Sequence, residues 1–103
     1  PIRLCFDPLL AIPDFESIYG KFFVQVKEAL CGIPIQDASI GVFRISDSYL
    51  KKMRKTRPNS AILQYPFTNE DHICNYGKRS KKMISFAQDC LKEWIPAENI
   101  YTL

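Results

Sequence analysis

Pro1 is the residue whose chemistry depends most on its position, because an N-terminal proline carries a free secondary amine on a rigid ring. In an apolar site desolvation disfavours the charged form, so such an amine can act as a base near neutral pH. Residues 2–6 predict a short strand that would hold the amine in place. The alternative is that Pro1 is only the residue at which this sequence begins, since one residue is a weak motif.

The cysteines and the single histidine do not have the spacing of a metal site. They are Cys5, Cys31, His72, Cys74 and Cys90. No two cysteines form a C-x-x-C pair, whereas a closed zinc site takes four ligands with characteristic short spacings. We therefore expect no metal and no cofactor. We interpret the cysteines as reduced and mostly buried, as in a cytosolic protein.

Basic residues are concentrated in the second half of the chain, although the net charge is only +3. They form two clusters, Lys51, Lys52, Arg54, Lys55 and Arg57, and then Lys78, Arg79, Lys81 and Lys82. Either cluster could hold a phosphate, a sulfated sugar or nucleic acid, and the alternative is a solvated loop and a solvated helix start. No aromatic residue lies inside either cluster to stack a base, so nucleic acid is not the expected partner.

Length and composition predict one domain, residues 1–103, with one core. The apolar content of 47% is ample for a folded protein. No apolar run approaches the roughly 18–20 residues of a membrane span, and no segment has the layout of a signal peptide. We therefore expect no membrane partner and a cytoplasmic protein.

Hydrophobic periodicity predicts two helices, residues 13–31 and 80–94, with Ser80 as the N-cap of the second. Short apolar runs predict strands at residues 2–6, 39–45, 60–65 and 99–103, and the basic stretch 46–59 is expected to be mostly loop. The apolar faces of the helices are Phe15, Ile18, Tyr19, Phe22, Phe23, Val26, Ala29 and Leu30, and Met83, Phe86, Ala87, Cys90, Leu91 and Trp94.

The order of these elements predicts an α/β fold of two βαβ units. They would form a four-stranded sheet with two antiparallel helices on one face. A ferredoxin-like domain has the same order of elements, and the pattern alone does not separate the two arrangements.

Four stretches, in this order and spacing, resemble one known family. Pro1 opens the first strand, residues 29–34 (ALCGIP) resemble a Gly-Lys-Pro helix end, and residues 77–83 (GKRSKKM) resemble an Asn-Arg-Ser helix entry. Residues 94–101 (WIPAENIY) resemble a Pro-x-Arg-Ile-Tyr return strand. The chain is similar to the macrophage migration inhibitory factor (MIF) and D-dopachrome tautomerase family of the tautomerase superfamily, as a divergent, C-terminally short member.

The resemblance implies keto–enol tautomerisation of a small aromatic 2-oxo acid or its enol, of the phenylpyruvate or dopachrome type. Pro1 would be the general base and then the acid. Ile33, the backbone N–H of Phe67, and Tyr101 of a neighbouring subunit would line the substrate. The resemblance also implies a homotrimer, and it adds secretion without a signal peptide as an alternative location.

Departures from the family pattern argue for weak or altered activity. Ile33 stands where the family has the lysine that pairs with the substrate carboxylate, and Pro66 has no N–H to donate. The family's C-terminal hairpin has no counterpart in the sequence. The alternative function is a non-catalytic, cytokine-like protein that binds a receptor or an anionic partner through the two basic clusters.

Overall fold

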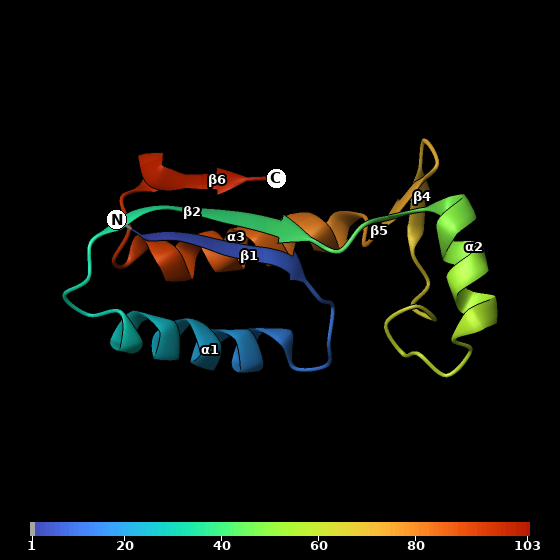
Figure 1. The fold of residues 1–103 in the computed structure, drawn as a ribbon, viewed down its shortest axis with the longest axis horizontal. Helices are drawn as coiled ribbons and strands as arrows, with labels where there is room; N and C mark the ends of the chain where they lie inside the picture. Colours follow the sequence, from blue (N-terminus) through green and yellow to red (C-terminus); the bar gives the residue numbers. More distant parts are fainter. Residues whose placement is uncertain (1) are drawn as a thin grey trace.

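A parallel sheet of three strands forms the larger part of the structure, a computed structural model that describes residues 2–103. Its strand order is β1-β2-β6, with β1 at Ile2–Leu9, β2 at Ile35–Val42 and β6 at Ile100–Thr102. Two long helices, α1 (Phe15–Ala29) and α3 (Lys78–Lys92), connect and cover these strands (Figure 1). The predicted α/β class is confirmed.

Both long helices pack on the same face of this sheet and share one core. Phe23, Ile40, Met83 and Leu91 are almost completely buried there. The two helices run in the same direction in Figure 1, from the carboxyl ends of the strands toward their amino ends. The prediction of antiparallel helices was therefore wrong, because each crossover between parallel strands requires its helix to return against the strand direction. None of the described helices is long and apolar enough to cross a membrane.

A second, smaller unit lies beyond the carboxyl end of β2 (Figure 1). It contains helix α2 (Asp47–Thr56) and an antiparallel sheet of order β3-β5-β4. The strands are β3 (Ile45–Ser46), β4 (Thr68–Glu70) and β5 (Ile73–Asn75). The four-stranded sheet expected from the sequence is thus replaced by two three-stranded sheets.

Helix α2 occupies most of the stretch that was predicted to be loop. The Ser46 hydroxyl accepts a hydrogen bond from the Tyr49 N–H at 3.3 Å and so caps the helix. Leu50 is buried and Met53 is half-buried, which gives α2 an apolar side despite its charge. The predicted strand at residues 60–65 is a turn instead, in which the Ser60 hydroxyl accepts from the Leu63 N–H at 3.3 Å.

The loop between β4 and β5 has only two residues, Asp71 and His72, with φ of 51° and 67°. Two consecutive residues in the left-handed region make a tight hairpin turn of the kind that matches the twist of the strands. The Asn69 side-chain oxygen supports this turn by accepting from the His72 N–H at 3.1 Å. The turn places His72 beside the start of α2.

The start of α3 also differs from its prediction. Gly77, with φ of 60°, occupies the N-cap position, and Ser80 lies inside the first turn with its hydroxyl buried and without a hydrogen-bond partner in the described structure. A short 3-10 helix, Ala97–Asn99, precedes β6.

Candidate functional site

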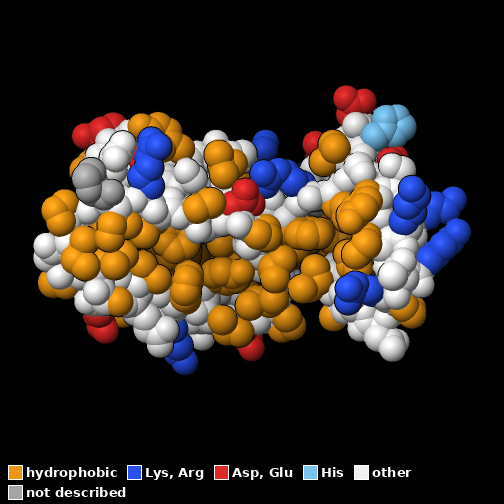
Figure 2. All heavy atoms as spheres, in the orientation of Figure 1, with side chains coloured by type: hydrophobic (Ala, Val, Ile, Leu, Met, Phe, Trp, Pro, Cys, Tyr) orange, Lys and Arg blue, Asp and Glu red, His pale blue; other side chains and the backbone are white. Residues whose placement is uncertain are grey.

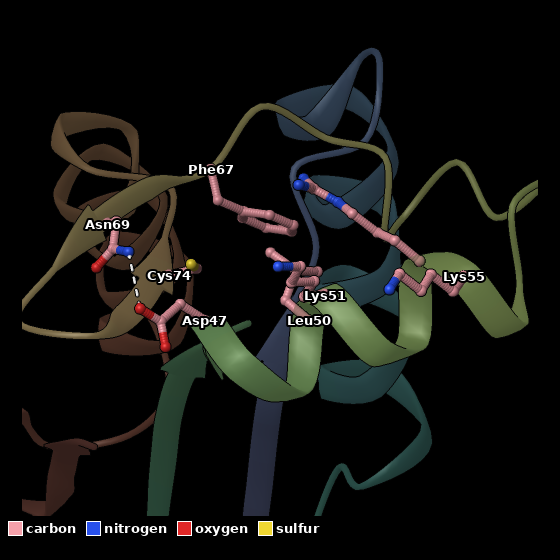
Figure 3. Close-up of a pocket in the computed structure, with 8 residues that line it drawn as sticks. Asp47, Leu50, Lys51, Lys55, Phe67, Asn69 and Cys74 are labelled. Carbon is pink, nitrogen blue, oxygen red and sulfur yellow. Dashed lines mark hydrogen bonds between the residues drawn. The ribbon is translucent and has the colours of Figure 1, made fainter.

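A cavity of about 500 Å³ lies between α2 and the β4–β5 hairpin (Figure 3). It combines an apolar wall with a row of basic side chains. Its lining residues are Asp47, Leu50, Lys51, Arg54, Lys55, Phe67, Asn69 and Cys74.

Phe67 forms the aromatic wall of this cavity, and its ring is held by three aromatic neighbours. The ring centroids lie 5.6 Å from Phe43, 5.4 Å from Tyr65 and 5.4 Å from Tyr76, the last ring being stacked on it. Below this wall, the buried Leu50 and Cys74 close the floor. A ring entering the cavity would therefore meet a fixed apolar surface.

The basic side of the cavity comes from α2. Lys51, Arg54 and Lys55 are spaced i, i+3 and i+4, so they share one face of the helix. Arg54 is used structurally, because its Nε donates to the Leu63 carbonyl at 2.7 Å and its Nη2 to the Tyr65 carbonyl at 2.8 Å. These two bonds tie α2 to the chain that leads into Phe67.

Lys51 and Lys55, unlike Arg54, do not hold the structure together through charged contacts. Both are exposed, and neither forms an ion pair within residues 2–103. In the space-filling view, Lys and Arg side chains gather over the end of the molecule that carries α2 (Figure 2). Two ammonium groups without carboxylate partners thus stand at the rim of an aromatic-walled cavity.

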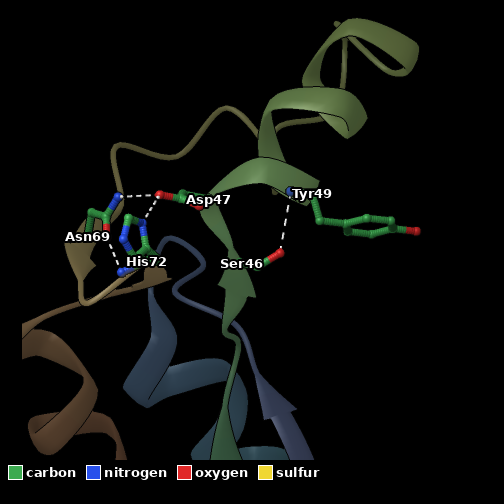
Figure 4. A network of polar contacts seen from close by, with 5 residues as sticks. All are labelled: Ser46, Asp47, Tyr49, Asn69 and His72. Atoms are coloured by element: carbon green, nitrogen blue, oxygen red, sulfur yellow. Dashed lines mark hydrogen bonds and ion pairs between the residues drawn. The ribbon is translucent and has the colours of Figure 1, made fainter.

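Asp47 lies at the other end of the cavity, and its carboxylate already has partners within the protein (Figure 4). Its Oδ2 accepts from Asn69 Nδ2 at 3.3 Å and lies 2.9 Å from His72 Nδ1. These contacts, with His72 contributing most, hold the pKa of Asp47 below its usual range. The carboxylate links the hairpin to the first turn of α2 and so fixes the distance between the two walls.

Of the residues that the family resemblance pointed to, Ile33, Phe67 and Tyr101 line no common pocket in residues 2–103. Pro1 lies outside the described residues, but the Ile2 N–H donates to the Pro34 carbonyl at 3.3 Å, which places the start of β1 beside Ile33. Ile33 precedes β2, whereas Phe67 packs on Phe43, just beyond its other end. The eight residues of β2 span roughly 26 Å, at about 3.3 Å per residue.

Tyr101 lies on the sheet face that the helices leave open. Its neighbour Thr102 accepts a hydrogen bond from Gln88 of α3 at 3.2 Å, so the alternation along β6 turns Tyr101 the other way. Tyr101 is 52% exposed and in register with Ser39 of β2. The predicted role of Tyr101 involves a neighbouring subunit, and this part of the hypothesis stays a prediction.

Ile33 contributes to a separate cavity of about 290 Å³ at the amino end of the sheet. Leu30, Cys31 and Trp94 also line it, together with Lys27. Burial of Cys90, nearby in α3, raises the pKa of that thiol. In residues 2–103, no group of three or more His, Cys, Asp and Glu side chains is placed to hold a metal ion.

Sequence reasoning missed the α2 cavity because it treated residues 46–59 as loop. The signals were present: Ser46-Asp47 has the chemistry of a helix start, and Leu50 and Met53 are spaced i, i+3. Once residues 47–56 are helical, Lys51 and Lys55 fall on one side of it.

Comparisons with known proteins give information about the fold alone. No family model matches the chain, and no curated protein matches it significantly. A solved structure of a spore photoproduct lyase mutant superposes on it with a TM-score of 0.71 over 97% of this chain, at 12% sequence identity. The chain spans 32% of the length of that protein. At this identity the similarity describes the arrangement of helices and strands.

Proposed function

We propose that this chain is a binding module for small organic anions that have an aromatic body, and that the cavity between α2 and the β4–β5 hairpin is its site. The observation that carries this proposal is the pair Lys51 and Lys55, exposed and without ion-pair partners in the described chain, beside the fixed ring of Phe67. The anionic group would meet the two ammonium groups, and the ring would lie against Phe67.

The size and charge of the cavity fit such a ligand. A volume of about 500 Å³ lies within the usual range of small-molecule sites, which combine apolar walls with a few charged groups. Three cationic side chains line it against one carboxylate, Asp47, which is engaged by Asn69 and His72. A phosphate monoester or a carboxylate on an aromatic ring satisfies both halves of the site.

The test is a titration of the protein with phenyl phosphate, followed by calorimetry and by NMR shifts of the α2 amides. Each lost hydrogen bond to a charged group costs on the order of 1.5–3 kcal/mol, so Lys51→Ala or Lys55→Ala should weaken binding roughly ten- to a hundredfold. Lys52→Ala is the matched control, because Lys52 is on the same helix but does not line the cavity. Equal weakening by all three variants would show only a general effect of net charge and would refute the proposed site.

Tautomerase chemistry at Pro1 is the second candidate, and one observation favours it. The Ile2–Pro34 hydrogen bond brings the start of β1 next to Ile33, which borders a largely apolar cavity. The test is an assay with phenylpyruvate on protein whose N-terminal amine is verified as free. Pro1→Gly should abolish the activity, whereas Lys51→Ala should leave it unchanged. The homotrimer and the role of Tyr101 belong to this candidate, and light scattering tests the homotrimer.

A further inference from the structure

Another cavity, of about 340 Å³, lies where the chain leaves β1 and where α3 begins. Three segments far apart in the sequence enclose it: residues 10–13, residues 61–65, and the pair Tyr76 and Arg79. Its walls are mainly apolar, and Ile12, Pro13 and Ile62 are among the aliphatic residues that line it. Ile62 is 43% exposed, so an apolar side chain stands in solvent at this cavity.

Arg79 is the cationic side chain of this cavity, and its present partners are all uncharged. Its Nη1 donates to the Tyr65 hydroxyl at 3.2 Å, and its Nη2 donates to the Ile12 carbonyl at 3.4 Å. Both bonds are long for a guanidinium, which pairs with a carboxylate at about 2.7–2.9 Å. Asp14 and Glu16 border a neighbouring cavity that Arg79 also lines, but no ion pair joins either of them to Arg79.

The phenol groups of the cavity are compatible with an anion. Burial raises the pKa of Tyr76, so its hydroxyl stays protonated and adds no negative charge. Tyr65 packs edge-on against Tyr76 with ring centroids 4.8 Å apart, and its hydroxyl now accepts from Arg79. A hydroxyl is both a donor and an acceptor, so it can turn its proton toward a carboxylate that takes over Arg79.

We propose that this cavity is a binding site for monocarboxylates with an apolar body, distinct from the α2 cavity. The guanidinium of Arg79 forms two parallel hydrogen bonds with the carboxylate, and the hydrophobic part of the ligand lies against Ile12, Pro13 and Ile62. A single arginine in an apolar wall matches one negative charge, which favours a carboxylate over a phosphate dianion. The site does not depend on the function proposed for Lys51 and Lys55.

The experiment is an NMR titration with hexanoate, whose aliphatic body offers no ring to Phe67 of the α2 cavity, and with the uncharged 1-hexanol as the matched ligand. Arg79→Gln should weaken the acid at least tenfold and the alcohol less than twofold, and Arg79→Lys should lie between. Tyr65→Phe keeps the ring and should weaken the acid a few-fold. Lys51→Ala, at the other cavity, should leave this binding unchanged. Arg79 and Lys51 are exposed, so their variants are expected to fold.

An independent variant tests the place of binding rather than its charge. Ala61 is an exposed lining residue, and Ala61→Trp should block the cavity and remove binding of both the acid and the alcohol. The proposal is overturned if wild type does not bind the acid at millimolar concentration, if Arg79→Gln binds it as well as wild type, or if Ala61→Trp has no effect. It is also overturned if Lys51→Ala removes the binding, because the acid then occupies the α2 cavity.

Discussion

Gly41 on β2 gives a sharp test of how the carboxyl end of the sheet is packed. A Cβ atom added at this position would stand 2.7 Å from both Cγ and Oδ1 of Asp7 on the neighbouring strand. Real Cβ atoms do not approach other atoms so closely, so the carboxylate of Asp7 must move. That carboxylate forms a two-point pair with Arg44, at 3.1 and 3.2 Å.

The cost of Gly41→Ala follows from these contacts. Overpacking in a well-filled site costs about 1–3 kcal/mol, and the Asp7–Arg44 pair, which is partly exposed, adds about 0–1 kcal/mol when it breaks. Because the Asp7 side chain can rotate away, we expect the free energy of unfolding to fall by about 1–2 kcal/mol. For a chain of this length that lowers Tm by roughly 4–16 °C.

The assay is urea unfolding, followed by the fluorescence of Trp94 and by circular dichroism. A double-mutant cycle separates the clash from other effects: with Asp7→Ala in place, Gly41→Ala should cost less than about 0.5 kcal/mol, which gives a coupling of about 1 kcal/mol. Gly20→Ala is the matched control, because the added Cβ would meet only Phe86 at an ordinary 3.5 Å. Alanine in a helix is favoured over glycine by about 1 kcal/mol, so this control should stabilise. A loss at Gly41 that stays the same without the Asp7 side chain would refute the reasoning.

Three further predictions concern the smaller unit and its junction with α3. Arg54→Ala leaves the Leu63 and Tyr65 carbonyls without their donor and should lower the free energy of unfolding by about 2–4 kcal/mol in the same urea assay, and Arg54→Lys should recover part of it. The pKa of Asp47 is lowered in the folded state, so its contribution is present above the unfolded value of about 3.9 and is lost as pH falls through the folded value. Asp47→Asn should therefore be less stable than wild type near pH 6, and the difference should shrink toward pH 2 in an acid-unfolding series. Gly77→Ala should destabilise by about 1–2 kcal/mol in thermal unfolding, because φ of 60° disfavours a side chain and the new Cβ would lie 2.7 Å from the Thr68 hydroxyl.

The parts of the fold that the sequence predicted are those with a long, uninterrupted pattern. The stripe from Phe15 to Leu30 predicted a helix, and the apolar run around Ile40 predicted a strand, and both are present. The relative direction of the two helices was predicted wrongly, because it depends on whether the strands that follow them run the same way in one sheet, as β2 and β6 do, and hydrophobic pattern does not encode that. Residues 60–65 have strand composition, yet the Ser60 hydroxyl offers a local turn that satisfies the same backbone groups.

The candidate sites were less accessible from the sequence than the fold, because they combine residues that only the topology brings together. Tyr65, in a turn, joins the Arg79 cavity to the ring of Phe67, and Arg54 binds its carbonyl from α2. The spacing of these residues along the chain does not predict that they lie together. The basic clusters were visible, but their division into a structural arginine and two free lysines required the hydrogen bonds.

The two ends of the parallel sheet now carry competing functional hypotheses, and their separation makes them distinguishable. Ligands of α/β sheets bind at the carboxyl ends of the strands, and the cavities at Phe67 and at Arg79 both lie there. The tautomerase hypothesis concerns the amino end, where β1 starts next to Ile33 through the Ile2–Pro34 hydrogen bond. An aromatic anion whose NMR shifts cluster at α2 or at the start of α3 supports the binding function, whereas shifts confined to Ile33 and Trp94 support the tautomerase. Because β2 separates the two ends, a ligand bound at one of them contacts no residue of the other, so the shift map decides between the two functions.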